Sequence, residues 1–169
     1  MALRPLGVDN LTGRVEMKKL VMAAVLALAM LGSVSQAAES ESTPAANAVN
    51  RDYAAGKQAV DRKDWPAAAA SFRKAVAAEP NNADAYNMLG YSLRWMGKMD
   101  EAFAAYDRAL QINPKHRGAL EYSGVAYLKA GEPAKANEQL GKLETIAGKN
   151  SEEYRDLAKA ISDYNAGKK

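Results

Sequence analysis

Few residues in this chain have a type and spacing that could form an active site. It has 169 residues, with one histidine, His116, and no cysteine. Glu121 and Ser123 follow closely, but the segment "EYS" falls within one expected helix, whereas catalysis needs a nucleophile and base, or two acids, in one cleft. No glycine-rich phosphate loop, HExxH or GxSxG motif is present. We therefore predict no catalytic residue, and an enzyme is kept only as an alternative.

The same composition offers few side chains that could bind a metal ion or attach a cofactor. A chain without cysteine cannot form disulfides, cysteine-ligated zinc sites or an acylated cysteine anchor. One histidine cannot supply a histidine-rich metal site, and no carboxylate loop of the D-x-[DN]-x-[DN]-G type is visible. We predict no metal and no cofactor.

Aromatic residues and glycines alternate at short intervals in "YNMLGYSLRWMGKMDEAFAAY", residues 86–106. Such a mixture is a packing pattern, and it belongs to a longer repeat with a period of 34 residues. Four columns of the sequence share that period: Gly56, Gly90 and Gly124; Ala68, Ala102 and Ala136; Phe72, Tyr106 and Leu140; Pro80 and Pro114. One period shared by four residue classes indicates a repeated structural unit.

Each unit is expected to contain two amphipathic helices, which makes the fold all-α. The expected helices are 51–62 and 67–78, then 83–96 and 100–112, then 117–130 and 134–146. Helix starts are assigned to the N-caps Asp64 and Asp100 and to Pro66 and Pro133 in first turns. Helix ends are assigned to Gly97, Gly131, Pro80 and Pro114.

Small residues in these columns allow close helix packing, and the neighbouring aromatics fill the remaining space. In the second unit we expect Gly90 and Ala102 to let the paired helices approach. Tyr86 and Tyr106 are then expected to occupy the space beside them.

These columns resemble the tetratricopeptide repeat family. The second unit matches its signature best, at Tyr86, Leu89, Gly90, Leu93, Ala102, Tyr106, Ala109 and Pro114. The resemblance implies an α-α superhelix of three hairpins over residues 49–150, with units at 49–82, 83–116 and 117–150. The third unit departs from the pattern, with Leu143 at a small-residue position and Gly148 in place of the closing proline.

Residues 151–169 are expected to form a capping helix and tail. Ser151 suits the N-cap, and Glu152 and Glu153 suit the first turn. Apolar residues share one face of this helix: Tyr154, Leu157, Ala158, Ile161 and Tyr164. A stack of repeats needs such a helix to cover its last apolar face.

In this family the first helix of each unit lines a concave groove that binds the partner. Carried over by register, the groove residues are Asn50, Tyr53, Lys57, Asn87, Tyr91, Arg94, Trp95, Glu121, Tyr122 and Val125. Tyrosine, tryptophan and arginine are the residues that binding hot spots favour. For the aromatic members, packing between the helices is the alternative interpretation. Lys57 and Arg94 are expected to be solvated charges rather than specific anchors of the partner.

One subclass of the family holds the carboxylate of chaperone tails in a basic and amide clamp. The matching positions here are Tyr53, Lys57, Met88, Gly118 and Tyr122. Only Lys57 has the right chemistry, so the clamp is absent and a chaperone-cofactor role is not expected.

Residues 1–37 contain the pattern of an export signal. Two lysines follow Met17, an apolar run of 12 residues extends from Leu20 to Leu31, and small residues predict cleavage before Ala38. A bilayer span needs about 20 apolar residues, so a run of 12 favours a cleaved signal. A retained membrane anchor is the alternative. We take Met17 as the start, with residues 1–16 either a long leading segment or an upstream extension. Residues 38–48 are expected to be a flexible linker.

After such cleavage the chain has 19 Lys or Arg against 18 Asp or Glu, interspersed along the helices. A nucleic-acid binder shows a basic face instead. The sequence therefore predicts a periplasmic or secreted adaptor that binds a peptide or protein in its groove. A self-associating subunit of an envelope complex, using the third unit or Trp65 as its contact, is the main alternative.

Overall fold

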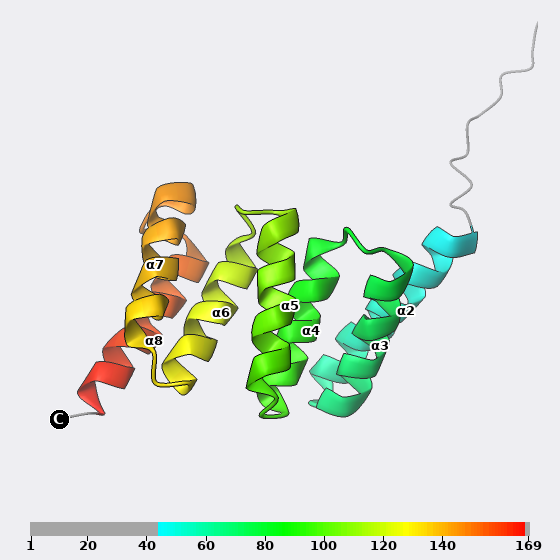
Figure 1. Ribbon diagram of the computed structural model, residues 1–169, viewed down its shortest axis with the longest axis horizontal. Coiled ribbons are helices and arrows are strands. Elements are labelled where there is room, and N and C mark those ends of the chain that lie inside the picture. Colours follow the sequence, from blue (N-terminus) through cyan, green and yellow to red (C-terminus); the bar gives the residue numbers. More distant parts are fainter. Residues whose placement is uncertain (1–43, 168–169) are drawn as a thin grey trace, which may run out of the picture. The chain divides into compact units, whose positions relative to one another are not determined.

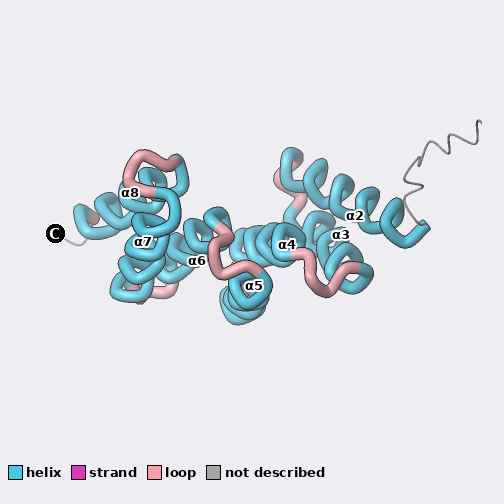
Figure 2. Tube along the Cα trace, turned by 90° about the horizontal axis from the view of Figure 1, so that it is seen from above, coloured by secondary structure: helices cyan, strands magenta, loops and turns pink. Residues whose placement is uncertain are grey.

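The computed structural model describes residues 44–167, and side-chain surroundings from Arg51 onward. The start at Met17, the export signal and the cleavage site before Ala38 lie outside these residues. The described part consists of helices joined by short loops, with no strand (Figures 1 and 2). Its helices are α2 (Pro44–Asp61), α3 (Trp65–Ala78), α4 (Ala83–Trp95), α5 (Met99–Ile112), α6 (Arg117–Lys129), α7 (Pro133–Ala147) and α8 (Glu152–Ala166). The all-α prediction is confirmed.

Consecutive helices pair into three hairpins, α2 with α3, α4 with α5, and α6 with α7. Neighbouring hairpins then contact each other through α3 and α4, through α5 and α6, and through the two first helices α4 and α6. The hairpins therefore follow one another in a row (Figure 1). Helix α8 packs against both α6 and α7 and covers the last hairpin.

Helix α2 begins earlier than the sequence analysis expects, at Pro44 rather than Arg51. The last part of the predicted linker, residues 44–48, is therefore helical. The reason lies in the sequence "PAANAV": proline suits the first position of a helix, and alanine is the best helix former.

Most predicted helix boundaries are confirmed. Asp64 accepts a hydrogen bond from the Ala67 amide at 3.2 Å, and the Ser151 hydroxyl accepts one from the Tyr154 amide at 3.4 Å. Gly97 and Gly131 have φ angles of 76° and 79°, in the left-handed region where glycine is favoured.

The predicted N-cap at Asp100 is wrong. Helix α5 begins one residue earlier, and its cap residue is Lys98, which makes no side-chain capping bond. The preceding turn fixes this start, because the Lys98 amide donates to the Leu93 carbonyl at 3.0 Å, as the Asp64 amide does to the Ala59 carbonyl at 2.8 Å. Asp100 lies within the first turn of α5, where a carboxylate is favourable near the helix N-terminus.

Glycine and aromatic residues interlock inside the first two hairpins. A Cβ added at Gly56 would lie 2.6 Å from the Phe72 ring, and one at Gly90 would lie 2.7 Å from the Tyr106 ring. Both rings are fully buried, so these glycines are required by close approach. Tyr86, the other expected filler, is only half-buried and lies under the guanidinium of Arg108.

The third hairpin is packed differently. The space beside Gly124 is filled by Leu157 of α8, which would lie 2.6 Å from an added Cβ. Leu157 and Ile161 belong to a second buried cluster with Leu120, Leu128, Ala136 and Leu143. The predicted capping helix is confirmed, and it contributes core residues to the hairpin it covers.

Candidate binding site

Four aromatic residues from three helices meet at one place. Trp65 begins α3, Tyr91 and Trp95 lie on α4, and Tyr122 lies on α6. The two indole rings are stacked with centroids 5.2 Å apart and planes 10° apart. Tyr91 contacts Trp65 at 5.9 Å, Trp95 at 6.3 Å and Tyr122 at 4.9 Å. We call these four residues the aromatic cluster.

Local sequence explains how the cluster is positioned. Tyr91 and Trp95 are one helical turn apart and so project from the same side of α4. Trp65 is held at the first position of α3 by the Asp64 cap and by Pro66. Trp95 remains 46% exposed, whereas the other three are half-buried. The indole ring of Trp95 is thus exposed to solvent while Trp65 and Tyr91 hold it in place.

Arg94 lies beneath this cluster. It is only 7% exposed, so the expectation of a solvated charge is wrong for Arg94. Its guanidinium carbon lies 5.2 Å from the Tyr91 ring centroid and 5.3 Å from that of Trp95, and these rings cover it. Its Nε has no hydrogen-bond partner among the described residues, and neither has the buried hydroxyl of Tyr106. Burial raises the pKa of Tyr106, and the charge of Arg94 partly opposes that rise.

A second cation reaches the cluster from α6. The Nζ of Lys129 lies 4.6 Å from the Trp95 ring centroid, within the range of a cation–π contact. Partial burial, followed by the charge of Arg94, lowers the pKa of Lys129. Two positive charges therefore flank the exposed indole.

The remaining predicted groove residues have other surroundings. Tyr53 packs edge-on against Phe72 at 5.5 Å and lies against the buried cluster that contains Phe72 and Tyr106. Lys57 is exposed, and Val125 packs against the second core cluster. Asn87 is buried beside Gly118, and its Oδ1 is unpaired among the described residues. The side chain of Asn50 lies outside the described surroundings.

Glu121 lies among like charges. It is half-buried, and burial, followed by the nearby carboxylates Asp156, Glu153 and Glu152 of α8, raises its pKa to about 7. The charge of Arg94 acts in the opposite direction. Burial and the Glu121 charge also raise the pKa of Tyr122.

The structure thus brings together four of the predicted groove residues, Tyr91, Arg94, Trp95 and Tyr122. The sequence analysis did not place Trp65 or Lys129 among them. Lys129 could have been found, because it lies 34 residues after Trp95 in the same repeat column. Trp65 could not, since it lies on the second helix of its unit, where groove positions are not expected.

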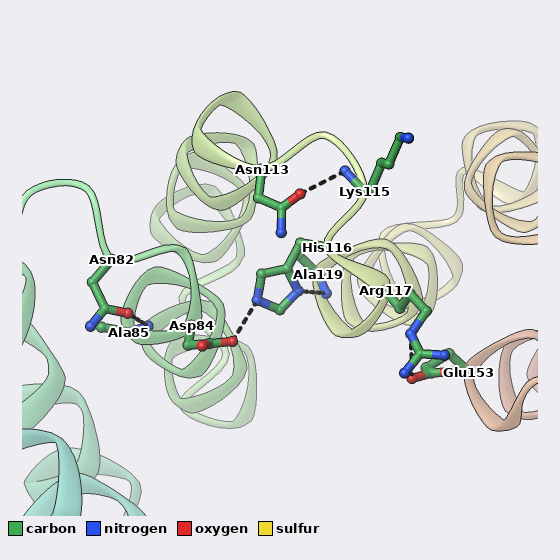
Figure 3. A network of polar contacts seen from close by, with 9 residues as sticks. All are labelled: Asn82, Asp84, Ala85, Asn113, Lys115, His116, Arg117, Ala119 and Glu153. Atoms are coloured by element: carbon green, nitrogen blue, oxygen red, sulfur yellow. Dashed lines mark hydrogen bonds and ion pairs between the residues drawn. The ribbon is translucent and has the colours of Figure 1, made fainter. Parts of the chain in front are cut away.

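His116 has a structural position, which Figure 3 shows. Its Nδ1 accepts a hydrogen bond from the Ala119 amide at 3.1 Å and caps α6. The proton must therefore be on Nε2, which donates to the Asp84 carboxylate at 3.0 Å. Beside it, Arg117 pairs with Glu153 at 3.3 Å (Figure 3). These contacts join α4, α6 and α8.

An open hollow of about 650 Å³ lies beside Asp84 and His116. It is lined by the loops before α4 and α6, and its lining residues include Asn82 and Asn113 as well. Within residues 44–167 no three histidine or acidic side chains are grouped so that they could hold a metal ion. None of the helices in that range is long and apolar enough to cross a bilayer.

The family model of the tetratricopeptide repeat matches residues 83–116, which form α4, α5 and the loop before α6. No curated protein sequence matches the chain.

Solved structures share the fold. The TPR2B domain of yeast Sti1, in a complex with pHsp70, is 20% identical with a TM-score of 0.64, covering 71% of this chain and 98% of that chain. The Arabidopsis OM64 TPR domain is 17% identical with a TM-score of 0.64, covering 70% and 97%. The Yersinia enterocolitica type III secretion translocator chaperone SycD is 17% identical with a TM-score of 0.62, covering 72% and 91%.

Two kinds of observation indicate the same fold. One is the row of hairpins with glycines packed against aromatic rings, and the other is the family match together with the similar structures. Residues 83–116 are a tetratricopeptide repeat, set within the fold of a tetratricopeptide repeat domain.

Proposed function

We propose that this chain is an adaptor that binds a protein or peptide partner at the aromatic cluster, without chemical turnover. The observation that carries this proposal is the exposed indole of Trp95, stacked on Trp65 and flanked by Arg94 and Lys129. Tryptophan and arginine are enriched among the residues that dominate binding energy. A ring already held in place loses little entropy when a partner covers it.

The similar structures support a role in partner binding. The yeast Sti1 domains were solved in complexes with pHsp70 and with pHSP90, and SycD is described as a translocator chaperone. In these structures the fold occurs in a complex with another protein or in a chaperone. The same use in this chain is part of our proposal.

The test is capture of partners from the native source by the wild-type chain and by a Tyr91→Ala/Trp95→Ala variant. We expect the wild type to enrich a small set of proteins and the variant to lose them. Tyr127→Ala is the matched control, because Tyr127 is a half-buried aromatic outside the cluster, stacked on Phe103 at 4.6 Å. Equal capture by all three proteins would contradict the proposed site.

Light scattering over a range of protein concentrations measures the molecular mass and distinguishes an adaptor from a self-associating subunit. An adaptor stays monomeric until its partner is added, whereas a structural subunit grows in mass as its concentration rises. A wild-type dimer that Trp65→Ala disrupts would favour the alternative, because Trp65 is its proposed contact.

Export to the periplasm is a further part of the proposal, and it depends on the signal pattern in residues 17–37. The intact mass of the protein recovered from the periplasmic fraction tests it. We expect the mass of a chain beginning at Ala38. A mass that includes the apolar run from Leu20 to Leu31 would contradict cleavage.

A further inference from the structure

Two cations, Arg94 and Lys129, share one exposed aromatic ring. The guanidinium carbon of Arg94 and the Nζ of Lys129 lie 5.3 Å and 4.6 Å from the Trp95 ring centroid. Neither side chain forms an ion pair among the described residues. Exposed lysines elsewhere do find partners, as Lys98 does with Glu101 at 3.0 Å and Lys159 with Asp163 at 2.6 Å.

The missing partner matters most for Arg94. A charged side chain that is 93% buried, with an unpaired Nε, is unfavourable unless an opposite charge or hydrogen bonds compensate for its lost hydration. Contact with the aromatic faces and the attraction of Glu121, which lies beyond ion-pair distance, compensate in part. Lys129 adds a like charge to the same place, which a bound anion would relieve.

We propose that the partner of this adaptor carries a carboxylate, from an aspartate, a glutamate or a chain end, that binds beside Trp95 between Arg94 and Lys129. The proposal rests on the function proposed above and names the chemistry of the bound segment, an acidic peptide with an apolar residue next to its acid. The apolar residue covers the indole of Trp95. The carboxylate accepts hydrogen bonds from the two cations.

The neighbouring charges favour a peptide over a nucleic acid. Glu121 faces the same region from α6, and Glu152, Glu153 and Asp156 act on it from α8. These carboxylates would repel the repeated phosphates of a nucleic acid, whereas a peptide brings a single negative charge to the two cations. The positions also differ from the family's carboxylate clamp, whose places are held here by residues such as Met88 and Gly118.

The first experiment selects binders to the full-length chain from a randomised library of displayed peptides. We expect the recovered peptides to contain aspartate or glutamate next to an aliphatic or aromatic residue. Their binding should weaken as salt is raised, because the contact is ionic. A single-stranded oligothymidine is measured in parallel, and tighter binding of that probe than of the peptides would overturn the proposal.

The second experiment measures the affinity of one recovered peptide for variants of Lys129, which is exposed and can be changed without opening the core. Lys129→Glu should weaken binding by about tenfold or more, since the attraction becomes a repulsion. The same variant should prefer a version of the peptide whose acid is replaced by lysine. Lys135→Met is the control, because Lys135 also lies over an aromatic ring, 5.3 Å from the Tyr127 centroid, but outside the cluster.

The outcomes separate this inference from the proposed function. Peptides that need Trp95 but lack acids, and that bind Lys129→Glu as well as the wild type, would overturn the inference and leave the adaptor function standing. Peptides whose binding survives Tyr91→Ala/Trp95→Ala would overturn both. Failure to select any peptide from the library would also count against both.

Discussion

The first two hairpins and the third solve the same packing problem with different residues. In the first two, a glycine on the first helix faces a buried ring on the second, as Gly56 faces Phe72 and Gly90 faces Tyr106. In the third, Leu140 stands in the aromatic column, and the space beside Gly124 is taken by Leu157 from α8. The third hairpin therefore depends on a helix outside the repeat.

This difference divides the domain into two parts. The first two hairpins fill their cores with their own residues, whereas the core of the third hairpin is filled in part by α8. The aromatic cluster draws residues from both, because Trp65, Tyr91 and Trp95 belong to the first two hairpins and Tyr122 to the third. Partner binding should therefore respond to changes in α8 even though no member of the aromatic cluster lies on that helix.

Removing α8 should have the largest effect. Deletion of residues 151–169 removes Leu157 and Ile161 from the second core cluster, and each buried aliphatic side chain contributes about 2 to 5 kcal/mol. We expect loss of hydrogen-exchange protection in α6 and α7, with α4 and α5 still protected. Uniform loss across all helices would show that the hairpins do not differ as proposed. Lys159→Ala, on the exposed face of α8, is the control and should leave the protection unchanged.

Adding one methyl group at the equivalent glycines should separate the two kinds of joint. Gly90→Ala places a carbon 2.7 Å from the Tyr106 ring, and such overpacking costs about 1 to 3 kcal/mol. Gly124→Ala meets the terminal methyl carbons of Leu157, which can shift more easily than a ring. The gain in helix propensity, about 1 kcal/mol, applies to both variants, so Gly124→Ala should be the less destabilised of the two.

Chemical denaturation of both variants measures this difference in the free energy of unfolding. Equal losses in the two would contradict it.

The contact between α6 and α8 should weaken as pH rises. Because the pKa of Glu121 is raised to about 7 in the folded chain, above its usual value, the carboxyl favours folding while protonated. That contribution is complete at low pH and is lost as pH rises through about 7.

Glu121→Gln should therefore stabilise the protein at pH 8, by about 1 kcal/mol after allowance for solvent screening, and change it little at pH 4. Glu138→Gln, an exposed acid on α7, is the control for simple loss of charge. A stabilisation that does not depend on pH would refute the electrostatic explanation.

Breaking the contact between His116 and Asp84, which joins the second and third hairpins, should have the smallest effect on stability. His116→Asn keeps the cap, because Asn82 caps α4 from the same repeat position by accepting from the Ala85 amide at 2.9 Å. It loses the contact with Asp84, whose exposed carboxylate makes that pair worth less than about 1 kcal/mol. His116→Ala loses the cap as well, which costs about 1 kcal/mol more. Thermal unfolding of both variants tests the order, and identical losses would mean that the cap contributes nothing.

Much of the fold could be predicted from the sequence because the repeat keeps the same residue types 34 positions apart. The three hairpins and the joints at Gly56 and Gly90 follow from those columns. The role of Leu157 does not, since it lies outside the repeat and 33 residues after Gly124. The predicted N-cap at Asp100 is wrong because the turn that all three hairpins share, and not the residue type, fixes where the second helix begins.

The candidate site could be predicted only in part, for a related reason. Repeat register places Tyr91, Arg94, Trp95 and Tyr122 on first helices, and the structure brings them together. The stacking of Trp65 on Trp95 arises where one hairpin meets the next, which no spacing within a unit reveals. Arg94 is buried against the rings of Tyr91 and Trp95 on its own helix, which its residue type does not predict.

Tryptophan fluorescence gives the most direct test of the claim that the aromatic cluster is the recognition surface. The chain has two tryptophans, Trp65 and Trp95, and both belong to the cluster. When the captured partner is titrated into the full-length chain, covering of the Trp95 indole predicts a saturable shift of the emission to shorter wavelengths, which a Trp65→Phe variant retains. Saturable binding measured independently, with the emission of both proteins unchanged, would contradict the account.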